Sequence, residues 1–149
     1  MSVHMVDVGG KPEVLRVAVA KGVIRLREET VKRILEGRVE KGDPFTVAKL
    51  AAIMAVKRTP EIVPLCHPIP VTGVDVDFEV KGRDVVVTVE VRAVARTGVE
   101  MEALTGVSAA LLAIWDMVKA YEKDEAGQYP ETVIREVRVV RKVKGGVGT

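Results

Sequence analysis

The sequence contains a single cysteine, Cys66, so it cannot form an internal disulfide. Chains without disulfides are typical of reducing compartments, and we expect a cytoplasmic protein. Histidine occurs only twice. Two histidines and one cysteine fall short of the usual tetrahedral ligand set of a zinc site, so we expect no bound metal.

Aromatic residues are scarce, at 3% of the chain, so the core must be built from Val, Ile, Leu, Ala and Met. No segment approaches the roughly 20 apolar residues that span a bilayer, and "MSVHMVDVGGKPEV" lacks the apolar run of a signal peptide. The net charge is only +2, from 23 basic and 21 acidic residues. This balance argues against nucleic-acid binding through bulk charge but does not exclude a local anion site.

At 149 residues and 48% hydrophobic content, the chain has the size and composition of one globular domain. No repeat and no linker rich in Pro, Gly or Ser divides it. We therefore predict one domain over residues 1–149, with flexible ends at about 1–12 and 144–149. Asn is absent, Gln occurs once, and Glu, Lys, Arg and Val are abundant, a composition typical of thermophilic proteins.

The spacing of apolar residues predicts the order strand, helices, strand, strand, helix, strand. In the second helix Asp43 is the expected N-cap, Pro44 the first helical residue, and Thr59-Pro60 the end. This order predicts an α+β, ferredoxin-like (βαββαβ) fold, with helices on one face of an antiparallel sheet. The expected strands are 13–26 (with a bend at Gly22), 71–80, 84–95 and 131–143, and the expected helices are 27–38, 43–59 and 97–124.

The long helix 97–124 carries apolar residues at intervals of three or four. We expect these residues to form its buried face. They are Met101, Leu104, Ser108 (a small residue in the series), Leu111, Trp115 and Val118.

The segment "PLCHPIP" places Leu65, Cys66 and His67 among three prolines. Because proline fixes its own φ angle and keeps the preceding residue extended, the segment should be stiff. Such a loop could present His67 and backbone groups to a ligand with little loss of entropy. The alternative is a rigid connection in which Cys66 is a small buried side chain.

In "RTGVEMEALTG", Glu100 and Glu102 fall in the first turn of the long helix. Acidic residues at this position interact favourably with the helix dipole, which is a structural explanation. Two neighbouring carboxylates can also raise the pKa of one of them and supply an acid or base. The sequence alone leaves both interpretations open.

In "WDMVKAYEKD", Asp116 and Lys119 are neighbours on one face of the same helix. They form either a surface ion pair or part of a catalytic site. Glu102 and Asp116 also share a face, but fourteen residues separate them by about 21 Å along the axis. If both serve one small substrate, a second subunit must supply one of them.

Two further lysines are candidates for anion binding. Lys41 precedes the expected N-cap, and helix N-termini favour anions. Lys142 lies at the end of the last strand, before the glycine-rich tail. Taken singly, each is most often a solvated charge.

Several long motifs together closely resemble those of the molybdenum cofactor biosynthesis protein C (MoaC) family, and the resemblance covers nearly the whole chain. The family comprises the cyclic pyranopterin monophosphate synthases, which are phosphorus–oxygen lyases. The resemblance implies conversion of (8S)-3′,8-cyclo-7,8-dihydroguanosine 5′-triphosphate to cyclic pyranopterin monophosphate, with release of diphosphate. The motifs are "HMVDVGGK", "GRVEKGDPFTVAKLAAIMAVKRT", "IVPLCHPIPVTGV", "RTGVEMEALTGVSAALLAIWDMVKA" and "VIREVRVVRKVKGG".

The resemblance also implies a ferredoxin-like fold and a homohexamer, a trimer of dimers with active sites between subunits. We expect no cofactor, and the sequence leaves open whether Mg²⁺ accompanies the triphosphate. The implied catalytic residues are Asp116, Lys119 and Lys41. The implied substrate-binding residues are Leu65, Cys66, His67, Glu100, Met101, Glu102 and Lys142.

The chain departs from the family pattern in two places. Its tail, "KVKGGVGT", lacks the second lysine that is usual in the family, although Lys144 is nearby. The segment "EKDEAGQYPET", residues 122–132, is longer than the usual link. We expect it to be a surface loop that does not touch the chemistry.

The competing hypothesis is a non-catalytic ferredoxin-like module, either a small-ligand sensor or an RNA binder. RNA-recognition domains stack bases on aromatic residues of their sheet. The two central strand segments offer only Phe78, which makes RNA binding a poor fit. A sensor would not need Lys41, His67, Asp116 and Lys119, and release of diphosphate would distinguish an enzyme from it.

Overall fold

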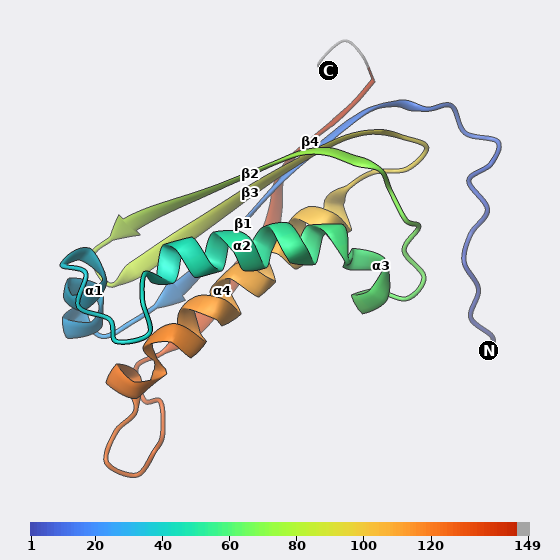
Figure 1. Cartoon of the computed structure of the whole chain (residues 1–149). Helices are drawn as coiled ribbons and strands as arrows, with labels where there is room; N and C mark the ends of the chain where they lie inside the picture. The colour runs from blue at the N-terminus through green and yellow to red at the C-terminus, as the bar shows by residue number, and fades with distance from the viewer. Residues whose placement is uncertain (146–149) are drawn as a thin grey trace.

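The computed structural model describes residues 1–145. Its four strands form one sheet in the order β2-β3-β1-β4, with every neighbouring pair antiparallel. Helices α2 and α4 lie across one face of this sheet (Figure 1). This is the predicted ferredoxin-like α+β fold. The elements are β1 (Val14–Arg25), α1 (Glu28–Leu35), α2 (Pro44–Lys57), α3 (Thr59–Ile62), β2 (Val71–Lys81), β3 (Asp84–Ala95), α4 (Glu100–Glu122) and β4 (Val133–Lys144).

The start of α2 follows the predicted capping chemistry. The side chain of Asp43 accepts hydrogen bonds from the backbone N–H of Phe45, at 3.1 Å, and from the hydroxyl of Thr46, at 2.7 Å. Pro44 occupies the first helical position, where its missing N–H costs no helical hydrogen bond. The helix that follows Lys41 is therefore firmly fixed at its N-terminus.

The end of α2 differs slightly from the prediction. The helix stops at Lys57, and Thr59-Pro60 opens the short helix α3 instead of a loop. Proline disfavours helix at the residue before it but is well tolerated in a first turn, so the same dipeptide ends one helix and begins another. The hydroxyl of Thr59 donates to the carbonyl of Ala55 at 2.9 Å, which joins the two helices.

The N-terminal segment lies outside the sheet and the helix layer. Residues 1–13 form no helix or strand and extend away from the body (Figure 1). The predicted flexible tail, residues 144–149, begins at the last residue of β4, and residues 146–149 lie outside the described part of the chain.

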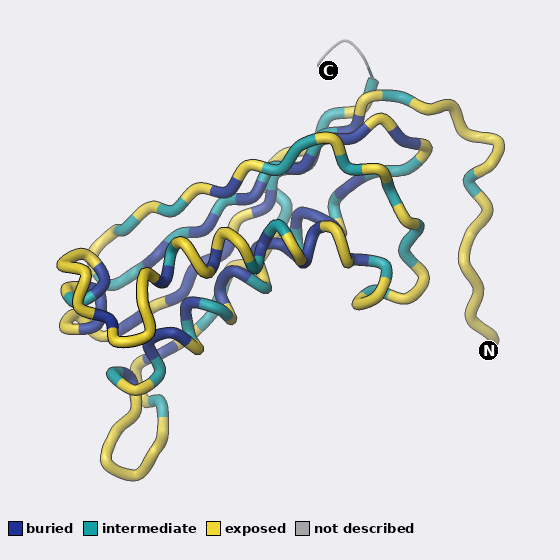
Figure 2. The backbone as a smooth tube through the Cα atoms, viewed as in Figure 1, coloured by how far each residue is buried: buried dark blue, intermediate teal, exposed yellow. Residues whose placement is uncertain are grey.

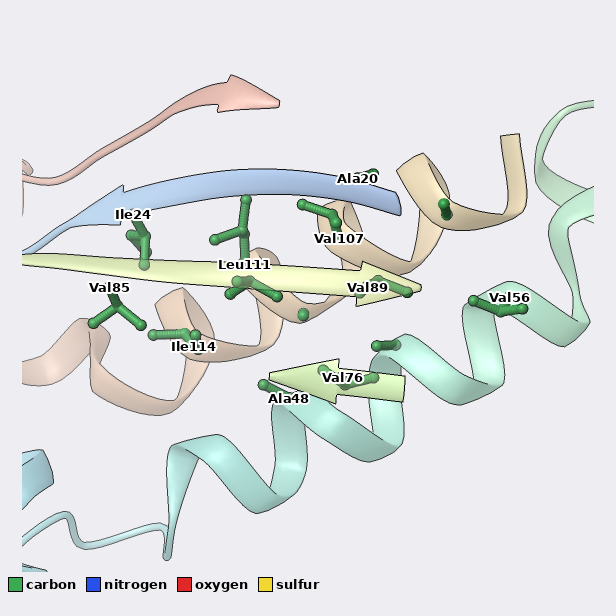
Figure 3. Close-up of a cluster of buried hydrophobic side chains, with 14 of the residues drawn as sticks. Ala20, Ile24, Ala48, Val56, Val76, Val85, Val89, Val107, Leu111 and Ile114 are labelled. Atoms are coloured by element: carbon green, nitrogen blue, oxygen red, sulfur yellow. The ribbon is translucent and has the colours of Figure 1, made fainter. Parts of the chain in front are cut away.

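The core lies between the sheet and the two long helices (Figure 2). As the scarcity of aromatic residues predicted, it is built almost entirely from aliphatic side chains (Figure 3). On β3 four inward-pointing valines alternate with partly exposed residues. They are Val85, Val87, Val89 and Val91, each fully buried.

The predicted buried face of α4 was partly wrong. Met101 and Ser108 are exposed, whereas Leu111 and Val118 are buried as expected. The true inward face includes several small residues, because the helix lies close to its neighbours and leaves little room. The fully buried aliphatic residues of α4 are Ala103, Val107, Ala110, Leu111, Ile114 and Val118.

Gly22 shows how closely α4 approaches the sheet. A Cβ atom at this position would lie 2.7 Å from Cγ1 of Val107 and 2.8 Å from Cδ1 of Leu111. The pairing of β1 with β4 also changes register between Lys21 and Val23, which corresponds to the predicted bend. Gly22 therefore both interrupts the strand pairing and lets the helix pack directly on the backbone of β1.

The C-terminal end of α4 is held by the carboxylate of Glu122, which is 1% exposed. This carboxylate accepts hydrogen bonds from the backbone N–H of Arg27, at 3.0 and 3.2 Å, and from the hydroxyls of Thr30 and, at 2.6 Å, Thr132. A buried carboxylate is tolerated when its oxygens are satisfied in this way. Glu122 thus connects α4 to the start of α1 and to the segment before β4.

Phe78 lies on the helix-covered side of the sheet. Its ring stacks on Phe45 of α2, with ring centroids 4.8 Å apart. It is therefore not presented on the open face of the sheet, where RNA-recognition domains stack bases. This arrangement removes the one aromatic residue on which the RNA-binding hypothesis depended.

By length and composition, α4 is apolar enough to cross a membrane. Half of its most apolar 18-residue window is buried inside the protein, where the helix covers the sheet. Core helices of globular domains meet the same criterion, so the helix is accounted for by its place in the core.

We predict that Gly22→Ala destabilises the fold, because the added methyl group must displace Val107 or Leu111. Overpacking of this kind typically costs about 1–3 kcal/mol, which should lower the melting temperature by about 3 °C or more. Thermal unfolding followed by circular dichroism measures this. Gly10→Ala is the matched control, since no atom lies within 4 Å of a Cβ there. Equal melting temperatures for the two variants would contradict the close-packing argument.

Candidate active site

The predicted site residues fall into two groups, one near each end of α4. The first, which we call the N-terminal cluster, gathers at the start of the helix and consists of Cys66, Glu100, Glu102 and Lys142. The second, which we call the lysine–aspartate cluster, lies nearer the C-terminal end and consists of Lys41, Asp116 and Lys119.

Glu102 is the buried centre of the N-terminal cluster, with 1% of its surface exposed. The thiol of Cys66 donates a weak hydrogen bond to Oε2 of Glu102, over 3.6 Å. The other oxygen, Oε1, is buried and has no hydrogen-bond partner among residues 1–145. A carboxyl group left half-satisfied in this way is costly to keep charged.

Burial shifts both titrating groups of this pair towards their protonated forms. Burial raises the pKa of the Glu102 carboxyl, and the charge of Glu100 adds a smaller effect in the same direction. Burial, followed by the nearby charge of Glu102, raises the pKa of the Cys66 thiol to about 11. The sequence left open whether one of the paired glutamates has a raised pKa; the pKa of Glu102 is raised, mainly by burial.

Lys142 joins this cluster from the far edge of the sheet. It pairs with Ala18 in the register of β4 against β1, and its amine lies 3.5 Å from Oε1 of Glu100. The antiparallel pairing of β4 thus carries a lysine from the end of the chain to the start of α4. The exposed ion pair contributes little to stability.

Three further predicted site residues, His67, Leu65 and Met101, belong to the same loop and helix motifs as the N-terminal cluster. His67 is half-buried, and its backbone carbonyl accepts from the Cys66 thiol at 3.8 Å. Leu65 and Met101 are 46% and 40% exposed. These two side chains flank the N-terminal cluster at the surface and are available to a ligand or to another subunit.

The lysine–aspartate cluster has Asp116 at its centre. The amine of Lys119 lies 3.0 Å from Oδ1 of Asp116, which confirms the predicted neighbours on one helix face. The amine of Lys41 donates to the backbone carbonyl of Asp116 at 3.0 Å and lies 3.5 Å from Oδ2. The loop before α2 therefore brings a second cation to the same carboxylate.

The charges of this cluster reinforce one another. The hydrogen bond from Lys119 lowers the pKa of Asp116, with a smaller contribution from Lys41. The same hydrogen bond raises the pKa of Lys119. At neutral pH both lysines are cations and Asp116 is a carboxylate, so the cluster has a net positive charge suited to an anionic ligand.

Sequence reasoning missed two aromatic residues beside this cluster. Trp115 and Tyr129 line a pocket of about 380 Å³ together with Asp116 and Lys119. Their ring centroids are 5.1 Å apart. After Glu122, the last residue of α4, residues 123–132 form a loop, as expected, and its Tyr129 lies beside the candidate residues Asp116 and Lys119. A lone tyrosine in an otherwise polar loop was the available signal.

The two clusters are held apart by α4 itself. Fourteen residues of one continuous helix separate Glu102 from Asp116, which corresponds to about 21 Å. Figure 1 shows that α4 runs without a break between its two ends. One small ligand cannot contact both clusters of the same chain.

Within residues 1–145, no group of three or more His, Cys, Asp or Glu side chains is arranged to hold a metal ion. The polar side chains of the two clusters are amines, carboxyls and one thiol. These groups can bind an anion and exchange protons.

Comparison with known proteins gives a consistent family assignment. The MoaC family profile matches residues 5–145. A probable cyclic pyranopterin monophosphate synthase of Pyrococcus horikoshii is 63% identical over 142 residues, covering 95% of this chain and 89% of the relative. The proteins of the same name from Thermococcus kodakarensis and Methanococcoides burtonii are 62% and 58% identical, over 96% and 95% of this chain and 92% and 89% of the relatives.

We predict that the Cys66 thiol reacts slowly with an aromatic disulfide reagent at pH 8. Raising the pKa from 9.0 to about 11 lowers the thiolate fraction about 100-fold. The greater nucleophilicity of the more basic thiolate offsets roughly tenfold of this, leaving a rate about tenfold below that of the unfolded chain. Because Cys66 is the only cysteine, absorbance of the released thiol measures it directly in native and urea-unfolded protein. A native rate equal to the unfolded rate would contradict the buried pair.

We predict that Glu102→Gln changes how stability depends on pH. Folding favours protonated Glu102, so the folded chain binds more protons than the unfolded chain between the ordinary pKa near 4.5 and the raised folded value. Wild-type stability therefore loses this contribution as the pH rises through that window.

The amide of Glu102→Gln cannot ionise, so the variant should gain stability relative to wild type as the pH rises. Urea unfolding at a series of pH values measures the difference. Glu125→Gln, in the exposed loop, controls for the loss of one carboxyl. A difference between Glu102→Gln and wild type that is constant with pH would reject the assignment.

Proposed function

The chain belongs to the MoaC family, and on that premise we propose that it is a cyclic pyranopterin monophosphate synthase of molybdenum cofactor biosynthesis. Its substrate is (8S)-3′,8-cyclo-7,8-dihydroguanosine 5′-triphosphate, and its products are cyclic pyranopterin monophosphate and diphosphate. The observation that carries this proposal is the grouping of the motif residues into a buried acid cluster and a cationic cluster on one helix.

The cationic residues fit the phosphate chemistry of this reaction. Lys41 and Lys119 supply two positive charges to a triphosphate, and Lys142 supplies a third from the other cluster. In the closing step a hydroxyl oxygen of the substrate forms a bond to the α-phosphorus. The bond from the α-phosphorus to the oxygen bridging to the β-phosphate breaks, and diphosphate leaves with that electron pair. Lysine cations stabilise the charge on the leaving group.

The two carboxyl groups are suited to opposite proton transfers. Glu102 is held towards its protonated form by burial and can donate a proton, while Asp116 is held ionised by Lys119 and can accept one. His67 lies beside Cys66 in the stiff loop and orients the substrate with the backbone groups there. Rebuilding a purine into a pterin needs both a donor and an acceptor.

We propose that the working site combines the N-terminal cluster of one subunit with the lysine–aspartate cluster of another. The separation of about 21 Å along α4 supports this, because no single chain offers both clusters to one substrate. The assembly we propose is a hexamer, a trimer of dimers. An exposed apolar stripe on α2 fits a subunit contact; it consists of Val47, Leu50 and Met54, which are 39%, 58% and 49% exposed.

We further propose that any Mg²⁺ enters with the triphosphate of the substrate and not as a resident ion. The reducing chemistry expected for a chain with one free cysteine supports a cytoplasmic location. The absence of Asn and the abundance of charged residues support a thermophilic source.

Turnover is the direct test of this function. The purified protein is incubated with the cyclised nucleotide triphosphate, and diphosphate and pterin are measured together. We expect Lys119→Ala to reduce turnover by at least about 100-fold, because it removes a positioned cation from the transition state, while the oligomer is retained. Turnover close to that of wild type in this variant would reject the role of Lys119.

Mixing two inactive variants tests whether the site is shared. His67→Ala and Lys119→Ala damage different clusters, so a mixed oligomer contains some sites in which both clusters are intact. If subunits combine at random, about a quarter of the wild-type activity should return after the two chains are refolded together. Each variant refolded alone is the control. No recovery from a properly mixed oligomer would place the whole site in one chain.

A further inference from the structure

The pocket beside the lysine–aspartate cluster is lined by two chemically distinct kinds of side chain. The apolar ones are Leu112, Trp115, Tyr129 and Ile134. The charged ones are Asp116 and Lys119, and Lys41 reaches the same carboxylate. A ligand that fills this pocket must therefore combine a flat or apolar part with an anionic part.

The pocket is lined by two aromatic residues, Trp115 and Tyr129, although aromatic residues are rare in this chain. The whole sequence has one Trp, two Tyr and two Phe. Phe45 and Phe78 stack on each other in the core, and the ring of Tyr121 lies against the guanidinium of Arg33. Trp115 and Tyr129, in contrast, line a pocket that also contains the candidate residues Asp116 and Lys119.

Trp115 and Tyr129 come from different segments and meet at this position. Trp115 precedes Asp116 on α4 and also packs partly against the core. Tyr129 lies in the loop between α4 and β4, and its ring is tilted by 60° to the indole. α4 thus supplies both charged and apolar lining, and Tyr129 of the loop adds a second aromatic ring beside Trp115.

We propose that Trp115 and Tyr129 form the wall on which the fused ring of the nucleotide substrate stacks, beside Lys119 and Asp116. Stacking on aromatic side chains is a general way to hold a nucleobase, because every base has an apolar face. The proposal rests on the function proposed above and adds a ring-binding subsite to it. Tyr129 is a positioning residue here: it holds the ring and takes no part in proton transfer.

The charges next to the wall favour a nucleotide over a purely apolar occupant. Lys119 lines the pocket next to the apolar residues, and Lys41 pairs with the same Asp116 carboxylate. The phosphates of a ring-bound nucleotide can reach both lysines. The other candidate occupant is a second copy of this chain, which would cover Trp115 and Leu112 by apolar contact alone. Apolar contact with a second copy would leave the charges of Asp116 and Lys119 in this pocket unused, whereas a nucleotide uses both the rings and the charge.

The sole tryptophan makes the subsite directly observable. Trp115 is the only indole in the chain, so its fluorescence reports on this wall alone. We expect GTP, which carries a purine ring and a triphosphate, to quench the emission in a saturable way. Tripolyphosphate, which has the charge but no ring, should compete with GTP without quenching. Equal effects of the two ligands would overturn the proposal.

Substitutions at Tyr129 separate ring stacking from folding. Tyr129→Leu should weaken GTP binding and raise KM for the cyclised nucleotide about tenfold, corresponding to roughly 1.4 kcal/mol of lost stacking, with kcat changed less than about threefold. Tyr129→Phe keeps the ring and should restore both values. Phe78→Leu removes an aromatic ring from the core and serves as the matched control, with KM unchanged.

The outcomes of these experiments are distinct. A Tyr129→Leu protein that binds GTP and turns over substrate like wild type would overturn the subsite, while wild-type release of diphosphate would leave the proposed function standing. Quenching by GTP that depends on Tyr129, without any turnover by wild type, would support a purine-nucleotide subsite and reject the synthase function. Trp115 emission that responds to protein dilution but not to GTP would show that a second copy covers the wall, and would overturn the subsite.

Discussion

The close packing of α4 on β1 is the constraint on which the arrangement of both clusters depends. Gly22 lets Val107 and Leu111 approach the strand backbone, and the aliphatic face of α4 then fixes the height and rotation of the helix. Because α4 is one unbroken helix of 23 residues, the members of the two clusters that lie on it keep a fixed distance from each other. A rigid element is a precise support for reacting groups, but it also prevents one chain from folding both clusters onto the same ligand.

Two buried glutamates on α4 show how environment separates structural from chemical roles. Glu122 and Glu102 are both 1% exposed. The first receives hydrogen bonds on both oxygens and joins three segments of the fold. The second has one weak thiol donor and one oxygen without a partner among the described residues. A carboxyl group that the protein leaves half-satisfied retains its capacity to bind a ligand or exchange a proton, at a cost in stability.

Much of this structure could be predicted from the sequence, because periodicity and capping are local properties. The strand alternation and Asp43-Pro44 were sufficient for the topology and the start of α2. The buried face of α4 was harder, since alanine gives no strong signal of burial and its inward position follows from the closeness of the sheet. The position of Tyr129 could not be derived, because a loop's path back to a helix depends on tertiary packing and not on the spacing of its residues.

The electrostatic contrast between the clusters is a chemical reason for the subunit assembly proposed above. In the N-terminal cluster Glu102 is buried and held towards its neutral form, whereas in the lysine–aspartate cluster Asp116 and Lys119 are exposed enough to be held charged. One environment could not serve both clusters. The burial that raises the pKa of Glu102 would also disfavour the charged form of Lys119. Placing the two clusters far apart on one helix keeps these environments separate within the chain. In the composite site proposed above, joining them across a subunit interface would bring a proton donor to the cationic cluster while each keeps its own environment.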